Sequence, residues 1–113
     1  IAQSPIITFL PDGKIVIANQ KAEKLFGLTK EELLGQNICD FMADPTPLKN
    51  GICDYFEAGS SSLIGTTSRQ TVRDICGRLF EVEIVISVSQ SDQDAMFTAI
   101  LRTVKADQQE RRV

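Results

Sequence analysis

The spacing of apolar residues changes along the chain and separates a helical part from a strand-rich part. Between residues 19 and 58, apolar side chains recur three or four positions apart, which predicts short amphipathic helices. From residue 62 onward the period becomes two, which predicts strands with one face on a core. A strand pair, 6–10 and 14–18, precedes the helices around the turn Pro11-Asp12-Gly13. The expected order is therefore two strands, several short helices and three further strands.

The helical part carries its own start and stop signals. Asn19 is suited to accept hydrogen bonds from the first backbone N–H groups of a helix, and Gly27 suits the left-handed residue that ends it. Thr29 and Glu32 have the spacing of a capping box, which predicts a second short helix directly afterwards. Both helices are therefore predicted from local chemistry alone.

Two further helices are predicted after these. Asn37 can cap a short helix over 38–42. Thr46 and Pro47 fit the N-cap and the first helical position of a longer one. Gly51 lies inside this longer helix, where it costs about 1 kcal/mol relative to Ala. We therefore expect this helix to be the least secure of the four.

The second part of the chain predicts three strands, over 63–74, 79–89 and 95–104. In the middle strand, Glu81 and Glu83 indicate a solvent-exposed face. The opposite face of that strand is apolar and consists of Phe80, Val82, Ile84, Ile86 and Val88. We expect this apolar face to lie on the core.

Two strands carry apolar residues on both sides. In 14–18, Ile15 and Ile17 share one side and Val16 occupies the other, so this strand should be mostly covered. In the last strand, Phe97, Ala99 and Leu101 alternate with Met96, Ile100 and Val104. A strand with only one face on the core would not need both sets. We expect the outer set to be dimer-face residues, covered by a partner chain or by the flanking segments.

Length, charge and hydropathy indicate a single globular domain and exclude some classes of partner. The 113 residues, 42% of them hydrophobic, suit a single domain with its own core. A net charge of −3 argues against a nucleic-acid partner. No apolar run approaches the roughly 20 residues that cross a bilayer, and no secretion signal is recognisable, so we expect no membrane contact by this segment and a cytoplasmic location. Because the chain begins at Ile1 without a methionine, we expect it to be part of a longer protein.

Residues that usually carry catalysis or bind metal are scarce. The chain has no histidine, no Gly-x-Ser-x-Gly motif and no phosphate-binding loop, so we expect no enzymatic activity. Cys39, Cys53 and Cys76 form no CxxC pair, and their odd number argues against a disulfide framework. A closed zinc site would need an acidic ligand to complete it. We expect reduced, largely buried thiols and no metal.

The order of these parts resembles a PAS domain. PDGKIVIANQKAEKLFGLTKEELLGQN is similar to the opening of the family, LKNGICDYFEAGSSSLIG to its long helix running into the third strand, and GRLFEVEIVISVS to its fourth strand. The resemblance implies an α+β fold, a PAS-like five-stranded antiparallel sheet with short helices packed on one face. It places a lead-in at 1–5, the PAS domain at 6–105 and the start of an exit linker helix at 106–113.

The resemblance also implies a sensory and regulatory role in signal transduction. Such a domain would belong to a larger signalling protein, for example a sensor kinase of a two-component system or a cyclic-dinucleotide enzyme. It would act as a homodimer and control an attached output domain through dimer contacts and the exit helix, without being an enzyme itself. The alternative is a sensor that binds a small organic molecule between the sheet and the helices.

Known cofactors of the family can be compared with the sequence. Flavin-binding members carry a reactive cysteine directly after the Asn of a Gly-x-Asn-Cys motif, whereas here Ile38 follows Asn37 and Cys39 comes one position late. One position on a helix is a rotation of about 100°, so a flavin adduct is disfavoured. A histidine-ligated haem is disfavoured because the chain has no histidine.

An unknown small organic ligand would lie between the sheet and the helices. The candidate pocket residues are Ile38, Cys39, Phe41, Tyr55, Phe56, Thr66, Phe80, Val82, Phe97 and Leu101. Cys39, Tyr55 and Thr66 would offer polar contacts. The alternative is that the apolar members simply fill a core.

Overall fold

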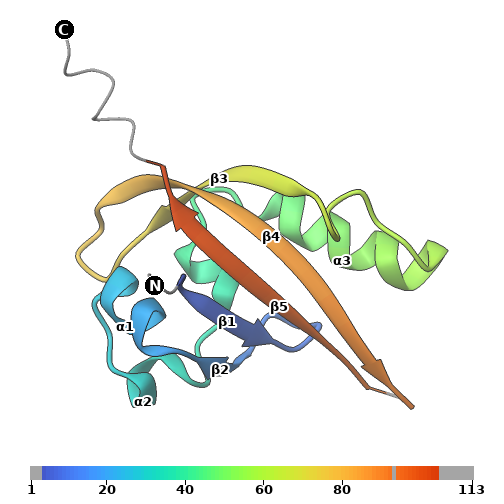
Figure 1. The fold of residues 1–113 in the computed structure, drawn as a ribbon, viewed down its shortest axis with the longest axis horizontal. Coiled ribbons are helices and arrows are strands. Elements are labelled where there is room, and N and C mark those ends of the chain that lie inside the picture. The colour runs from blue at the N-terminus through green and yellow to red at the C-terminus, as the bar shows by residue number, and fades with distance from the viewer. Residues whose placement is uncertain (1–3, 93, 105–113) are drawn as a thin grey trace, which may run out of the picture.

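A computed structural model describes residues 4–92 and 94–104, which form one sheet and several helices. The elements are β1 (Ile6–Phe9), β2 (Ile15–Ala18), α1 (Gln20–Phe26), α2 (Lys30–Leu33), the 3-10 helix η1 (Ile38–Phe41), α3 (Thr46–Ala58), β3 (Thr67–Arg73), β4 (Leu79–Ser91) and β5 (Asp94–Thr103). The sheet order is β2-β1-β5-β4-β3, and each neighbouring pair is antiparallel. The helices lie on one face of the sheet, which confirms the predicted fold (Figure 1). The exit helix predicted at 106–113 lies outside the described residues.

The predicted capping residues begin and end the first two helices. The Asn19 side chain accepts a hydrogen bond from the Ala22 N–H at 3.0 Å, and Gly27 takes a left-handed φ of 77° after α1. In α2, the side chains of Thr29 and Glu32 each accept from the other's backbone N–H. The capping box is therefore confirmed.

No helix in the part of the chain that the structure describes is long and apolar enough to cross a membrane.

Helix α3 begins one residue earlier than predicted, and its packing explains why a glycine lies inside it. Its N-cap is Pro45 rather than Thr46, because the Asp44 carboxylate accepts from the Thr46 N–H at 3.1 Å and the chain turns one residue early. Gly51 is buried within the helix, and a Cβ at this position would overlap the side chain of Leu63. The glycine therefore gives up helix propensity so that the loop after α3 can pack closely on the helix.

A β-bulge overturns the predicted facing of β2. Thr8 lies opposite Ile17, whereas Phe9, the next residue, lies opposite Ile15. Val16 is thus an extra residue in β2, and such an insertion turns the side chains on its two sides to different faces. Ile15 is 1% exposed, but Ile17 is 53% exposed. The expectation that this strand is mostly covered is wrong for Ile17.

The strand predicted over 63–74 is shorter in the structure, because β3 begins at Thr67. Residues before it form a turn in which Ile64 makes an isolated parallel bridge to Ile86, and the Gly65 N–H donates to the Ile86 carbonyl at 2.8 Å. The apolar residues at the start of the predicted strand therefore belong to a loop packed on the core. β4 and β5 lie where they were predicted, with β4 extended to Ser91.

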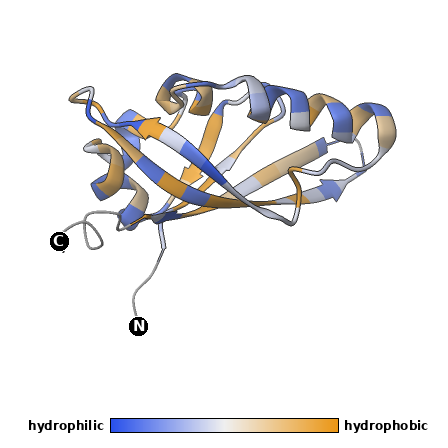
Figure 2. Ribbon diagram, turned by 90° about the horizontal axis from the view of Figure 1, so that it is seen from above, coloured by the Kyte–Doolittle hydropathy of each residue, from blue (hydrophilic) through white to orange (hydrophobic). Residues whose placement is uncertain are grey.

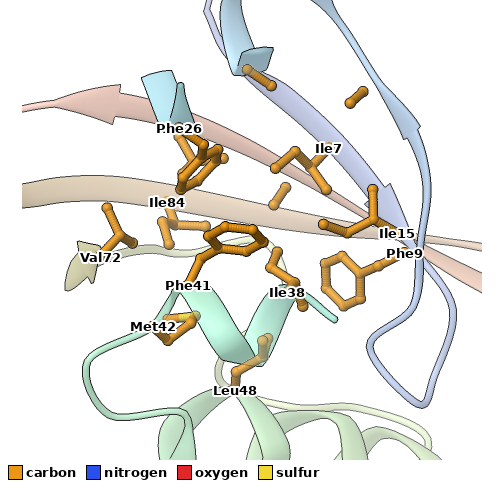
Figure 3. Close-up of a cluster of buried hydrophobic side chains, with 14 of the residues drawn as sticks. Ile7, Phe9, Ile15, Phe26, Ile38, Phe41, Met42, Leu48, Val72 and Ile84 are labelled. Carbon is orange, nitrogen blue, oxygen red and sulfur yellow. The ribbon is translucent and has the colours of Figure 1, made fainter. Parts of the chain in front are cut away.

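The core lies between the inner face of the sheet and the helices (Figure 3). Its fully buried large side chains are Ile7, Phe9, Ile15, Phe26, Leu33, Val72, Val82, Phe97 and Leu101. The rings of Phe26 and Phe41 join α1 to η1, with their centroids 4.9 Å apart. Polar and apolar positions alternate along the long strands (Figure 2), and Val82, Ile84 and Ile86 are buried as predicted.

The lead-in joins the sheet next to the strand that ends the domain. The Pro5 carbonyl accepts from the Leu101 N–H at 2.9 Å. The Asn19 side chain accepts from the Ile6 N–H and donates to the Ser4 carbonyl, both at 2.9 Å. Asn19 therefore ties α1, β1 and the lead-in together. The first and last strands of the domain, β1 and β5, are therefore neighbours in the sheet.

Candidate functional site

Most of the predicted pocket residues pack against one another inside the fold. Five of them are buried: Ile38, Phe41, Val82, Phe97 and Leu101. Phe80 is half-buried at the edge of the same cluster. The space that remains between sheet and helices, lined in part by Ile38, Ile84 and Ala99, has a volume of about 10 Å³. That is room for about one water molecule, so these side chains pack directly against one another. That a small organic ligand lies among them stays a prediction.

Three other predicted pocket residues do not line this core space. The Phe56 side chain is 52% exposed on α3. Tyr55 is half-buried, and its hydroxyl donates to the Gln90 side-chain oxygen on β4 at 2.9 Å. Thr66 is exposed in the loop before β3, where its hydroxyl donates to the Ser62 carbonyl. The structure does not bring the hydroxyls of Tyr55 and Thr66 together with the buried residues.

An open groove of about 550 Å³ lies between α3, η1 and the β1–β2 turn. This α3 groove is lined by Pro11, Asp12, Gly13, Asn37, Cys39, Asp40, Lys49, Ile52, Cys53, Phe56 and Glu57. The five residues from α3 are spaced three, four, seven and eight positions from Lys49, so they share one helix face. Cys39 and Phe56 are the two predicted pocket residues in the groove. The helical spacing of the other four α3 residues could have identified this groove from the sequence.

The wall of the α3 groove is fixed by Asn37. Its side-chain oxygen accepts from the Cys39 N–H, and its side-chain nitrogen donates to the Asp12 carbonyl, both at 2.9 Å. Asn37 thus caps η1, as predicted, and also joins η1 to the β1–β2 turn. Gly13 has a φ of 96°, and a Cβ there would overlap the Asn37 side chain. Glycine is therefore required for this close approach.

The thiols are less buried than the sequence predicted. Cys39 is half-buried, and Cys53 and Cys76 are exposed, one on α3 and one in the β3–β4 turn. Burial raises the pKa of the Cys39 thiol, against the opposing charge of Lys49 and together with that of Asp40. A raised pKa keeps the thiol protonated and makes it a weak nucleophile at neutral pH. Among residues 4–92 and 94–104, no three His, Cys, Asp or Glu side chains gather so that they could hold a metal ion.

A second open hollow, of about 600 Å³, adjoins the α3 groove at the tip of the β4–β5 hairpin. This hairpin hollow is lined by Leu10, Pro11, Asp12, Phe56, Ser89, Ser91, Asp94, Ala95 and Met96. Pro11, Asp12 and Phe56 line both spaces. The exposed Phe56 ring is therefore a wall that the two spaces share.

The outer face of the sheet, away from the helices, carries a row of apolar residues. Ile6 on β1, Ile100 on β5 and Val85 on β4 lie directly opposite one another. Ile100 is 42% exposed, and Met96 on the same strand is 37% exposed. Val104, just beyond the end of β5, is half-buried. Of the predicted dimer-face residues, Met96 and Ile100 thus lie on the outer side of β5 and Val104 follows its end. Whether a partner covers them stays a prediction.

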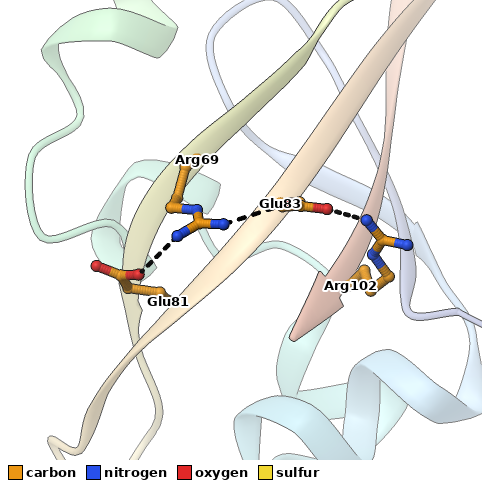
Figure 4. A network of polar contacts seen from close by, with 4 residues as sticks. All are labelled: Arg69, Glu81, Glu83 and Arg102. Atoms are coloured by element: carbon orange, nitrogen blue, oxygen red, sulfur yellow. Dashed lines mark hydrogen bonds and ion pairs between the residues drawn. The ribbon is translucent and has the colours of Figure 1, made fainter. Parts of the chain in front are cut away.

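Charged side chains form a polar network across β3, β4 and β5 (Figure 4). Glu83 pairs with Arg102 on β5 and, at 3.5 Å, with Arg69 on β3. Arg69 is also 3.7 Å from the Glu81 carboxylate. The hydrogen bond from Arg102, helped by Arg69 and opposed by partial burial, lowers the pKa of Glu83. The network ties three strands together close to the end of β5.

The fold and its family can now be compared with known proteins. A family model for the PAS fold matches residues 2–104, which is nearly the whole chain. The chain belongs to the PAS family. PAS domains are typically regulatory sensors and commonly sit in larger signalling proteins with output domains.

Two solved structures and one curated sequence illustrate the likeness. The PAS domain of a two-component sensor histidine kinase is 16% identical with a TM-score of 0.71, over 91% of this chain and 86% of that one. The PAS domain of a protein from Colwellia psychrerythraea is 18% identical with a TM-score of 0.76, over 91% of this chain and 87% of that one. A probable serine/threonine-protein kinase from Dictyostelium discoideum is 28% identical over 96 residues, 80% of this PAS domain. The domain spans only 6% of that kinase.

Proposed function

We propose that this PAS domain controls an attached output domain through homodimer contacts on the outer face of its sheet and a helix that continues from β5. The observation that carries the proposal is the apolar row of Ile6, Ile100 and Val85. Burial of apolar surface away from water favours association. In a two-fold dimer the same patch meets itself, so one row would cover the other.

Dimer contacts at this row would act directly on the ends of the domain. Ile100 lies on the strand that leads toward the C-terminus, and the hydrogen bond between Leu101 and Pro5 holds the lead-in beside it. A shift of β5 within the dimer would therefore move both connecting segments. The similarity to parts of kinases supports a kinase as the output domain. In this proposal the PAS domain is cytoplasmic, and catalysis belongs to the output domain.

Size-exclusion chromatography with light scattering tests the dimer, with residues 106–113 present and removed. We expect the wild-type domain to be a dimer and Ile100→Asp to be a folded monomer, because a charge cannot be buried in an apolar contact without a partner. Ile75→Asp is the matched control, since Ile75 is 55% exposed in a turn outside the sheet. A wild-type domain that stays monomeric at high concentration in both lengths would contradict the proposal. So would an Ile100→Asp variant that unfolds without a change in oligomer size.

A second candidate function, sensing of a small organic molecule, is supported by the α3 groove rather than by the core. The groove offers about 550 Å³ where the inner space offers about 10 Å³. Native mass spectrometry of the freshly purified domain tests it. A defined extra mass on the protein would support this function, and bare chains would count against it.

A further inference from the structure

The charges that line the α3 groove are predominantly negative. Asp12, Asp40 and Glu57 contribute three negative charges and Lys49 one positive charge, which gives a net charge of −2. Lys49 and Glu57 stand at opposite ends of the lining face of α3, about two helical turns apart. The end with Glu57 is also the C-terminal end of the helix, where the backbone dipole favours positive charge. A cation is therefore favoured at this end and an anion is repelled.

The same end of the groove presents an exposed aromatic ring. Phe56 is 52% exposed, although a large apolar side chain is costly to leave in water. Its ring meets those of Tyr55 and Phe97 at near right angles, with centroids 5.3 and 6.1 Å apart. Tyr55 is held in turn by its hydrogen bond to Gln90. The ring is therefore supported by the fold, and the face of an aromatic ring attracts cations.

We propose that the α3 groove binds a small organic cation that has an apolar body. Its ammonium group lies against the Phe56 ring, at the end of the groove where Glu57 supplies a carboxylate. Its apolar body lies along Ile52 and toward Cys53, on the same face of α3. The proposal gives the second candidate function, small-molecule sensing, a site and a ligand class, and it does not depend on the dimer.

Three probes of nearly equal size separate charge from shape. Phenethylamine is a cation at neutral pH, 2-phenylethanol is neutral, and 3-phenylpropanoate is an anion. Titration of the isotope-labelled 113-residue domain, followed by amide NMR, reports both affinity and place. We expect phenethylamine to shift the signals of Ile52, Phe56 and Glu57 and to bind about fivefold more tightly than the alcohol, as a partly exposed cation–π contact with nearby carboxylates implies. The anion should cause no shifts in the groove.

Variants on α3 separate a specific site from general attraction to an acidic domain. Phe56→Leu should weaken phenethylamine binding about threefold and Phe56→Tyr should preserve it, because only the second keeps an aromatic face. Glu57→Gln should weaken binding by a similar factor. Asp54→Asn is the matched control, since Asp54 is exposed on the same helix but does not line the groove. Thermal melts of each variant verify that the fold is kept.

Several results would overturn this inference. Equal binding of the amine and the alcohol would show that charge is not recognised. An equal loss in Asp54→Asn and Glu57→Gln would show general electrostatic attraction instead of a site. Shifts confined to residues outside the groove, or none at millimolar amine, would remove the site altogether. A domain that dimerises as proposed but gives any of these results would leave the dimer function intact and this inference wrong.

Discussion

Both faces of β5 carry apolar side chains, but only those on the inner face are buried. The inward residues Ala95, Phe97, Ala99 and Leu101 are at most 5% exposed, whereas the outward residues Met96 and Ile100 are 37% and 42% exposed. The helices cover the inner face, and among the described residues nothing comparable covers the outer one. Apolar residues on both faces of a strand therefore predict that both faces are buried against other parts of the protein or a partner. This pattern does not say which of them the chain covers by itself.

The two faces are also held together in different ways. On the inner side, close packing leaves about 10 Å³ unfilled, and the contact between Gly51 and Leu63 sets the distance of the covering loop. On the outer side, polar contacts link the strands: the hydroxyls of Thr8 and Thr98 are 2.9 Å apart, and Glu83 joins two arginines. We infer that the inner face determines stability and the outer face is adapted for contact.

The largest effect is expected from a charge on the inner face. Ile84 is 5% exposed and belongs to the core cluster. Ile84→Asp should unfold the domain, because burying an unpaired carboxylate costs several kcal/mol and a domain of this size has about 5–15 kcal/mol to lose. Circular dichroism and a thermal melt measure the result.

The neighbouring residue supplies the control for this experiment. Val85 lies on the outer face of the same strand and is only half-buried, so Val85→Asp should leave a folded domain. An Ile84→Asp variant with an unchanged melting temperature would show that the strand's orientation is wrong. If both variants unfold, the difference between the two faces is smaller than we infer.

A smaller effect is expected where the helix layer meets the loop. Gly51→Ala gains about 1 kcal/mol of helix propensity but places a Cβ against the Leu63 side chain, and overpacking of this kind costs about 1–3 kcal/mol. We expect a net loss of about 1 kcal/mol in the free energy of unfolding, measured with urea.

A double-mutant cycle separates the two contributions. In a Leu63→Gly background every side-chain atom that a Cβ at residue 51 would overlap is removed, so Gly51→Ala should become stabilising by up to about 1 kcal/mol. The contact between helix and loop would not be the reason for the glycine if Gly51→Ala had the same effect in both backgrounds.

Features set by neighbouring residues could be predicted from the sequence. The sequence identifies Asn19, Thr29 and Glu32 as capping residues because a side chain at a helix start bonds a backbone group only three residues away. The structure contains all three of these bonds. The alternation along β4 likewise identified its buried face, since period and facing are linked within one strand. These predictions required no knowledge of the tertiary fold.

Features that depend on contacts through space were missed. Ile17 is exposed because β2 has one residue more than β1 at the bulge, which only the pairing of the strands reveals. The α3 groove depends on the bond between Asn37 and Asp12, 25 positions apart. Only Cys39 and Phe56 of the ten predicted pocket residues line the groove, because the contacts that form it join residues far apart in the sequence.

The smallest effect is expected from the charges on the outer face. The pKa of Glu83 is lowered in the folded domain, chiefly by the hydrogen bond from Arg102. A lowered carboxyl pKa adds stability above the ordinary Glu value of about 4.3, and this contribution is lost as the pH falls through the lowered value. Wild type and Glu83→Gln should therefore differ in urea midpoint at pH 7 and converge in strong acid, with a smaller difference than Gly51→Ala causes.

Glu81→Gln is the control for this last comparison. It removes the same charge from the same face of β4, but Glu81 has a single, longer contact with Arg69, at 3.7 Å. Exposed ion pairs contribute little, so this variant should change the midpoint less than Glu83→Gln does at pH 7. A Glu83→Gln difference that persisted in acid would mean that the carboxylate acts through packing. The outer face would then contribute to stability in the same way as the inner face, and the division of roles between the two would have to be abandoned.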